Sequence, residues 1–261
     1  VFLGDDPDGA DPIVEMPEFE TEGWRHQYYD QVWGANYHYA KMSNMDHVHL
    51  PVVHGIQFSG KNPIRPPDHV VERFDTGFQT VTKPRPTLEN EWEGVQTIGA
   101  PVVSVIKFFR PGITTRGQVE IGGEGSGWFN IFYEFCTPID ERTTHMHYIL
   151  FRSFMLDEDM DGEHMRRNLK NIHEDKIVAE EMFPRVFPTR PNPRRYTVER
   201  EDRLMEAYWE QMETMRQKGW QIDRARLREL ERDSDYLCIP SPARRADPAH
   251  WVHGEVPRLA E

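Results

Sequence analysis

The sequence has only two cysteines, Cys136 and Cys238, and they lie far apart in the chain. It therefore has no CxxC pair, no zinc-ribbon pattern and no disulfide framework. Two thiolates are also too few for an all-cysteine iron–sulfur cluster, so any such cluster must come from outside this chain. We expect two buried, unpaired thiols and a reducing cytoplasmic setting.

The sequence also lacks an excess of basic charge and long apolar runs. Its net charge of −13 argues against a nucleic-acid partner, and no apolar run reaches the roughly 20 residues that cross a membrane. One basic stretch, "PRVFPTRPNPRRYTVER", carries five arginines against a single acid, Glu199. These arginines either pair with acids elsewhere on the surface, which we favour, or dock an acidic redox partner or a neighbouring subunit.

The 261 residues are 38% hydrophobic and 29% charged, which is typical of a globular protein that buries a core. Between residues 70 and 154, segments rich in β-branched and aromatic residues alternate with Gly and Pro, as in "HVVERFDTGFQTVTKP", "PVVSVIKFF", "GITTRGQVEI", "GWFNIFYEF" and "TTHMHYILFRSF". Helical patterns follow over about 163–182 and 199–218. Strands followed by helices predict an α+β fold with an antiparallel sheet.

The densest group of histidines lies in "NMDHVHLPVVHG". Residues 28–50 have helical periodicity, and Asp46 and His49 fall one turn apart on its otherwise apolar face. A buried acid and histidine must satisfy each other or a ligand. His47 falls on the opposite side and is expected to meet solvent. His38 shares the apolar face but lies about 16 Å from His49 along the axis, so it is interpreted as a core histidine.

His54 follows His49 by five residues, a spacing that would splay the two rings apart on an unbroken helix. Pro51 lies between them and tends to kink or end a helix. We therefore expect Pro51 to end the helix and to let His54 swing back towards His49. The pattern D-x-x-H-x-P-x-x-H then gives two ligands at a helix end, with Asp46 one turn behind them.

A third ligand is expected from the helix over 163–182. The apolar face of this helix consists of Met165, Leu169, Ile172, Ala179 and Met182. Asp175 falls inside that face, whereas Glu174, Glu180 and Glu181 are expected to point elsewhere. A carboxylate on a core face is costly unless it is paired or metal-bound. Asp175 is therefore either a metal ligand or one half of a buried salt bridge.

Two imidazoles and one carboxylate with open positions form the facial triad of non-haem Fe(II) oxygenases. Zinc hydrolases also use two histidines and a carboxylate. In zincins, however, the general base lies between the histidines of HExxH, and the interval here is "LPVV". No residue in it can act as a base, which counts against hydrolysis.

With these residues in place, the chain resembles the catalytic domain of the α subunit of Rieske non-haem iron ring-hydroxylating and demethylating oxygenases. The block "ANYHYAKMSNMDHVHLPVVHG" is similar to the family's N-x6-(E/D)-N-x2-D-x2-H-x4-H pattern, and "IHEDKIVAEEM" is similar to its E-D-x4-E segment. "TPIDERTTHMHYILFRSF" and "IPSPARR" also resemble family segments. One departure is that the Asn usually found before the aspartate falls on Ser43, with Asn44 one place later.

The resemblance implies a helix-grip fold, in which an antiparallel sheet wraps around a long C-terminal helix. It implies that residues 1–12 are the end of an upstream Rieske domain and linker, and that 13–261 form the mononuclear iron domain. It also implies Fe(II) held by His49, His54 and Asp175. Asp46 would bridge a catalytic histidine to a histidine ligand of the Rieske [2Fe-2S] cluster in a neighbouring subunit.

The family's activity is hydroxylation of an aromatic or similar ring with O₂. Electrons pass from NAD(P)H through a flavin reductase or ferredoxin and the Rieske cluster, and the product is a cis-diol or an alcohol that can lose formaldehyde. A homotrimer is the expected assembly. The alternatives are a non-catalytic ligand-binding module of the same shape and a zinc hydrolase. Six side chains are candidates either for an apolar substrate cavity or for plain core: Met42, Met45, Phe108, Phe109, Phe129 and Tyr133.

Overall fold

The computed structural model describes residues 8, 10–46, 49–54, 69–82, 104–110, 114–121, 125–188, 202–233, 236–239, 244, 246, 247, 249 and 253–259. The chain divides into two compact units, one formed by Val14–Ala207 and the other by Val1–Ile13 with Tyr208–Glu261. Within the described part of the chain, no helix is both long enough and apolar enough to cross a membrane. The assignment of residues 1–12 to a Rieske domain stays a prediction, as does a cytoplasmic setting.

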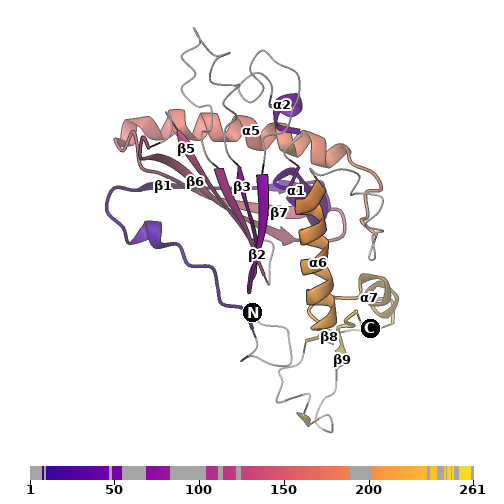
Figure 1. Cartoon of the computed structure of the whole chain (residues 1–261). Helices are drawn as coiled ribbons and strands as arrows, with labels where there is room; N and C mark the ends of the chain where they lie inside the picture. Colours follow the sequence, from indigo (N-terminus) through magenta and orange to yellow (C-terminus); the bar gives the residue numbers. More distant parts are fainter. Residues whose placement is uncertain are drawn as a thin grey trace. The chain divides into compact units, whose positions relative to one another are not determined.

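The larger unit is built on a seven-stranded antiparallel sheet with the order β1-β7-β6-β5-β4-β3-β2 (Figure 1). Its strands are β1 (Arg25–Trp33), β2 (His69–Phe74), β3 (Gly77–Thr82), β4 (Ser104–Phe109), β5 (Thr114–Ile121), β6 (Trp128–Pro138) and β7 (Thr144–Arg152). Strands β2 to β7 follow one another along the chain and across the sheet, so each pairs with its sequence neighbour. The five β-rich segments of the sequence are all strands, which confirms the α+β class.

Within the described residues, four α-helices and two short 3₁₀ helices accompany this sheet along the chain. They are η1 (Pro17–Phe19), α1 (Tyr37–Ser43), α2 (His49–Val53), η2 (Glu158–Met160), α5 (Asp161–Glu181) and α6 (Arg203–Gln217), the last of which runs across the division between the units. The smaller unit also contains α7 (Arg224–Leu230) and the parallel pair β8 (Leu237–Cys238) and β9 (Gly254–Glu255). Helix α5 agrees with the predicted helix to within two residues at each end.

The prediction was wrong for residues 28–33. The helical pattern was expected to begin at Tyr28, but β1 extends to Trp33 and pairs with β7 over its whole length. The strand alternates between exposed and less exposed side chains, which is the period of a half-buried strand. Here pairing with β7 outweighs the helical spacing of the apolar residues.

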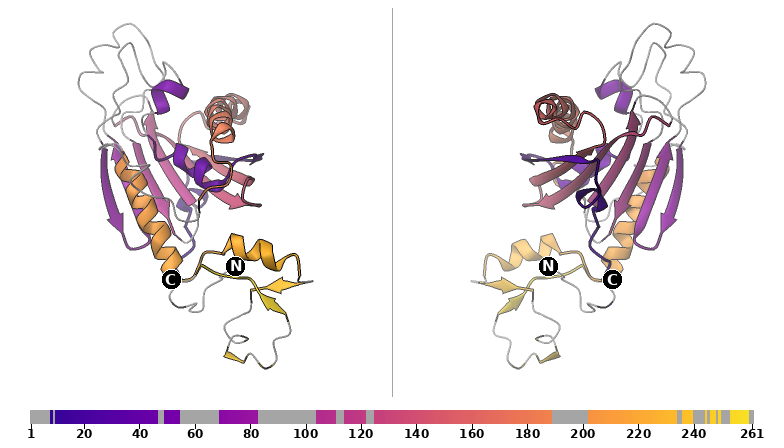
Figure 2. Two further views of the ribbon diagram at one scale, coloured as in Figure 1. Left: turned by 90° about the vertical axis from the view of Figure 1, so that its right-hand side faces the viewer. Right: turned by 90° about the vertical axis from the view of Figure 1, so that its left-hand side faces the viewer.

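The sheet has two differently covered faces, which the antiparallel register defines because opposite residues share a face. One face carries Gln27, Glu134 and Tyr148 and is covered by α1 and α5, which lie on the same side of the sheet in Figure 2. We call it the inner face. That the sheet wraps around a C-terminal helix, as in a helix-grip fold, stays a prediction.

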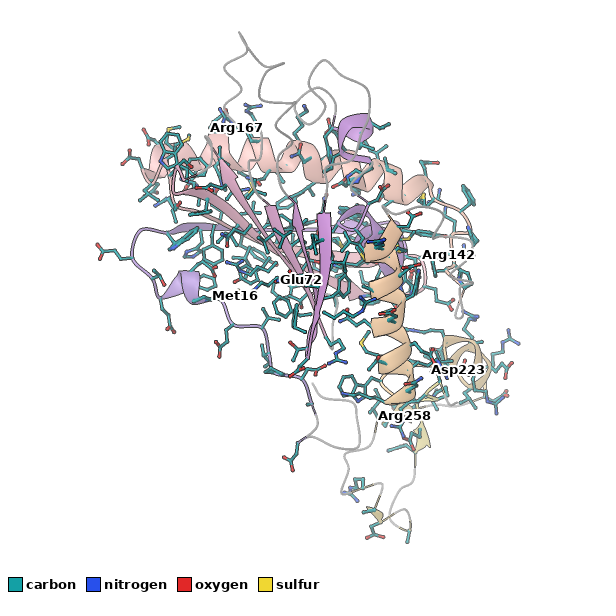
Figure 3. The ribbon with its side chains drawn as sticks, in the orientation of Figure 1. Met16, Glu72, Arg142, Arg167, Asp223 and Arg258 are labelled. Carbon is teal, nitrogen blue, oxygen red and sulfur yellow. The ribbon has the colours of Figure 1, made fainter. Side chains whose placement is uncertain are left out.

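The opposite face, which we call the outer face, packs against the segment of residues 14–24. Its core cluster consists of Ile131, Tyr133 and Phe151, with Val14, Met16 and Trp24 packed against it; Met16 is labelled in Figure 3. Tyr133 also donates a hydrogen bond to Glu18, whose other carboxylate oxygen accepts from Arg116.

Three of the six candidate cavity residues lie on the outer face, which corrects their assignment to a substrate cavity. Phe129 and Tyr133 belong to the cluster on this face, and Phe109 packs against Phe74 on the same side. These three are therefore plain core. Met45 and Phe108 are buried, and Phe108 shares the inner face with Thr115, its partner in the register. Of the two cysteines, Cys136 is buried as expected, Cys238 is only half-buried, and both are free thiols.

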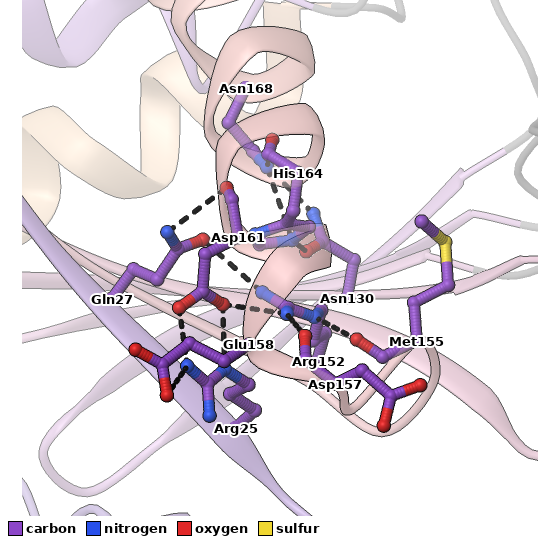
Figure 4. Close-up of polar contacts among 10 residues, drawn as sticks. All are labelled: Arg25, Gln27, Asn130, Arg152, Met155, Asp157, Glu158, Asp161, His164 and Asn168. Atoms are coloured by element: carbon purple, nitrogen blue, oxygen red, sulfur yellow. Dashed lines mark hydrogen bonds and ion pairs between the residues drawn. The ribbon is translucent and has the colours of Figure 1, made fainter.

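The start of α5 is tied to the sheet by a polar network (Figure 4). The Asp161 carboxylate accepts hydrogen bonds from Arg25 and from the fully buried Arg152. One turn later, His164 bridges Gln27 on β1 and Asn130 on β6. Asp161 is the first residue of α5. The network fixes α5, and therefore the later turns that carry Asp175, against the inner face.

We expect Asp161→Asn to destabilise the protein by about 2 kcal/mol, because it leaves the buried Arg152 guanidinium without its carboxylate. Arg25 and Arg152 lower the pKa of Asp161 below its ordinary 3.8. The stability that Asp161 contributes is therefore fully present above about pH 4 and declines as the pH falls below that value. Urea denaturation from pH 7 to pH 3 should show a larger loss for the wild type than for the variant.

Glu163→Gln is the control for this prediction. Glu163 lies in the same turn of α5 but pairs only with the exposed Arg166 and Arg167. Such surface pairs contribute little to stability, so this variant should unfold close to the wild type. Equal losses in both variants would show that charge at the helix N-terminus matters and that the Arg152 contact does not.

Candidate metal centre

His49, His54 and Asp175 come together as the sequence predicted. The Nε2 atoms of the two histidines are 3.2 Å apart, and Oδ1 of Asp175 lies 3.3 Å from the first and 3.2 Å from the second. Within the described residues, these three form one of two groups whose ligand atoms are close enough to share an ion. His54 is buried, and the other two are partly buried. The partners of Asp175 here are therefore two histidines and not an arginine.

The triangle of ligand atoms fits a divalent metal ion. An equilateral triangle with such edges has its centre about 1.9 Å from each corner, slightly less than the ~2.0–2.2 Å bonds that imidazole and carboxylate make to such ions. These three side chains would therefore hold a divalent ion without rearrangement, and two imidazoles with one carboxylate are the ligand set of a facial triad.

Glu174 orients one of the ligands, although the sequence analysis expected it to point elsewhere. The His54 Nδ1–H donates to Oε2 of Glu174 at 2.9 Å, which leaves the Nε2 lone pair directed at the shared position. A carboxylate behind a ligating histidine fixes its tautomer and raises its basicity. The helical phase placed Glu174 away from the apolar face of α5. However, α2 lies beside this part of α5, so the adjacent residues Glu174 and Asp175 both contact His54.

The break between the two short helices differs from the prediction. Pro51 was expected to end a long helix, but α1 already ends at Ser43, and Pro51 is the third residue of α2. Proline is tolerated in the first turn because the N–H there has no partner within the helix. The N–H of His54 still donates to the Leu50 carbonyl at 3.0 Å. His54 thus reaches the site from the end of the separate helix α2.

Asp46 is exposed rather than buried. It was expected on the buried face of a continuous helix, but it follows α1 in the connection to α2. Its side chain accepts a hydrogen bond from the His49 N–H at 3.3 Å, and its carbonyl contacts His49 Nδ1. Asp46 therefore contacts the ring of His49 through its main-chain carbonyl and the His49 N–H through its carboxylate.

A buried ion pair holds this connection to the sheet. Nζ of Lys41 on α1 donates to Oε1 of Glu134 on β6 at 2.8 Å, and both side chains are almost fully buried. The Asn44 amide donates to the same carboxylate oxygen at 2.7 Å. Asn44 is the residue one place out of register with the family pattern. Sequence reasoning missed this pair because each charge, taken alone, reads as a surface residue.

The surroundings of the site shift the pKa values of Asp175 and His54. Burial raises the pKa of Asp175, but His49 and His54 outweigh burial and lower it. Burial lowers the pKa of His54, while Asp175 and Glu174 outweigh burial and raise it. The carboxylates therefore stabilise positive charge at this point, which is what a site for a cation requires.

His38 is a core histidine, as expected. Its ring packs against Tyr37 and Phe187, and burial lowers its pKa to about 3. His47 lies outside the described residues, as do residues 189–201 of the arginine-rich stretch.

We expect Glu174→Gln to weaken metal binding by about 10- to 100-fold, the usual effect of removing the carboxylate behind a ligating histidine. The three ligands themselves remain, so the number of metal ions bound at saturation should stay the same. Equilibrium dialysis against a metal buffer measures both quantities. An unchanged affinity would show that the contact between His54 and Glu174 does not support the metal.

Comparison with known proteins gives matches over most of the chain. The family model described as vanillate O-demethylase oxygenase C-terminal domain matches residues 33–218. A search of curated proteins found no match. Among solved structures, NdmA of Pseudomonas putida CBB5 with caffeine is 19% identical with a TM-score of 0.62, and the alignment covers 77% of this chain and 55% of that one.

Two further solved structures have similar folds. NdmB of the same strain is 15% identical, has a TM-score of 0.59 and is aligned over 79% of this chain and 55% of its own. Dicamba monooxygenase bound to 3,6-dichlorosalicylic acid is 18% identical with a TM-score of 0.57, over 87% of this chain and 66% of that one. This chain thus spans about half the length of NdmA and NdmB.

Proposed function

The chain belongs to the vanillate O-demethylase oxygenase C-terminal domain family, and from this membership we propose that it is the terminal-oxygenase catalytic domain of a Rieske-type non-haem iron enzyme. The proposed reaction is O₂-dependent hydroxylation of an aromatic or similar ring. The observation that carries the proposal is the triangle formed by His49, His54 and Asp175. A facial arrangement with open positions suits a metal that must also bind O₂.

Fe(II) is the proposed metal, held by His49, His54 and Asp175, and when bound it would supply the activation of O₂. The chain's own residues prepare the site. Glu174 accepts a hydrogen bond from the Nδ1–H of His54, so Nε2 is left for the ion. The Asp161 and Lys41–Glu134 contacts hold α5 and the α1–α2 connection against the inner face.

The proposed substrate is a ring compound, and the reaction gives a cis-diol or an alcohol that loses formaldehyde, as in O-demethylation. The name of the family and the ring ligands of NdmA and dicamba monooxygenase favour this class. Electrons would come from NAD(P)H through a flavin reductase or ferredoxin and a Rieske [2Fe-2S] cluster bound outside residues 1–261. The proposed assembly is a homotrimer, in which the exposed Asp46 faces the Rieske histidine of a neighbour.

The test is a reconstitution with Fe(II) under anaerobic conditions, followed by addition of NAD(P)H, a reductase, a Rieske electron donor and a panel of methoxylated aromatic acids. We expect one Fe(II) per chain, O₂ uptake that depends on the ring substrate, and ¹⁸O from ¹⁸O₂ in the product. Tight zinc with ester or amide hydrolysis would contradict the proposal. A protein that binds the ring compounds but no metal would instead be a ligand-binding module.

A further inference from the structure

A second group of metal-ligating side chains lies on the outer face of the sheet. His145 and His147 are separated by one residue on β7, so their side chains share a face. Asp30 on β1 lies directly opposite His147 in the register. The two imidazole centroids are 4.0 Å apart, and Nε2 of His145 lies 2.6 Å from Oδ2 of Asp30.

The three residues can each offer one ligand atom within 4.8 Å of the others. Ligands in a tetrahedral site with bonds of about 2.0 Å lie roughly 3.3 Å apart. Small rotations of three partly exposed side chains therefore bring the atoms into range. The side chains of His145 and Asp30 are 33% and 43% exposed, so an ion can enter from solvent without opening the fold.

The surroundings of His147 favour a ligand role. The hydroxyl of Tyr28 is 2.7 Å from Nδ1 of His147, and the two rings stack. When the Tyr28 oxygen accepts from Nδ1–H, Nε2 of His147 keeps its lone pair for a metal.

We propose that Asp30, His145 and His147 form a second metal site that binds a divalent transition-metal ion, with Zn²⁺ as the ion that this ligand set suits best. Two imidazoles and one carboxylate select such ions over Mg²⁺ or Ca²⁺. The site lies on the outer face, whereas the ligands of the iron triad come from α2 and α5. It joins the edge strand β1 to β7, so a bound ion should stabilise that edge by mass action.

The experiment is a Zn²⁺ titration of the metal-free protein by calorimetry in four forms. The wild type should bind two Zn²⁺, and Asp175→Ala combined with His54→Ala should bind one. His145→Gln combined with His147→Gln should also bind one, and all four substitutions together none. A further variant adds His147→Gln alone to the double variant that lacks the triad. Its remaining site should bind Zn²⁺ at least about 100-fold more weakly, a larger effect than loss of an outer carboxylate has.

His253→Ala, which removes an exposed histidine outside both groups, is the control and should bind two ions. Circular dichroism on each variant verifies folding, and Co²⁺ in place of Zn²⁺ gives visible absorption that reports the ligand set independently. A second ion that persists in the His145 and His147 variants, or a triad-deficient protein that binds no Zn²⁺, would overturn the proposal. Neither result depends on oxygenase activity, so the proposed function stands or falls separately.

Discussion

Asp175→Ala should abolish stoichiometric iron binding and oxygenase turnover while leaving the protein folded. Loss of one of three ligands should weaken iron binding by well over about 100-fold, because loss of an outer carboxylate alone costs up to that much. Folding should survive because the partners of Asp175 among the described residues are two histidines rather than a lysine or an arginine. No buried charge is then left unpaired.

The measurement is iron content after anaerobic reconstitution and gel filtration, together with substrate-dependent O₂ uptake. Glu181→Gln is the matched control, since it removes a carboxylate from the same helix at a side chain that is 76% exposed. It should keep one iron per chain. If Asp175→Ala also keeps one iron, Asp175 is not a ligand. If both variants lose it, the effect is one of helix stability and the ligand assignment is unsupported.

The residues of this centre could be found from the sequence because they obey local rules. His49 and Asp175 fall on helix faces that are otherwise apolar, and burial of such groups is costly without a ligand. His54 was predicted from its spacing to His49 across Pro51, although it reaches the site from the separate helix α2 and not through a break at Pro51. Strands β2 to β7 could also be predicted from the sequence, because β-branched and aromatic runs separated by Gly and Pro identify them.

The local geometry of the centre could not be predicted, because it depends on tertiary contacts. Residues 28–33 have helical spacing, yet they form β1 because β7 offers a full-length partner. Helix α1 ends at Ser43, and the amide of Asn44, the next residue, donates to Glu134 across ninety residues, a tertiary contact that no local pattern shows. Glu174 was missed for the same reason, because helical phase says nothing about a second helix lying beside it.

The second large effect is expected at the buried ion pair between Lys41 and Glu134. Each single replacement, Lys41→Met or Glu134→Leu, should cost about 3–5 kcal/mol of unfolding free energy, because it leaves the other charge buried and unpaired. The double replacement should be close to the wild type, since two apolar side chains of similar size fill the same space. A residual cost of about 1 kcal/mol is expected, because the Asn44 amide loses its acceptor.

Urea denaturation of the four proteins gives the coupling energy as a double-mutant cycle. Arg226→Met, which breaks an exposed pair with Glu229, is the control and should change little. Additive single effects would show that Lys41 and Glu134 do not stabilise each other. If they are coupled, the double variant should regain the stability of the fold. It still lacks the Glu134 carboxylate that accepts from Asn44, two residues before Asp46. Weaker iron binding in that stable double variant would then assign the buried pair to positioning the α1–α2 connection at the metal centre.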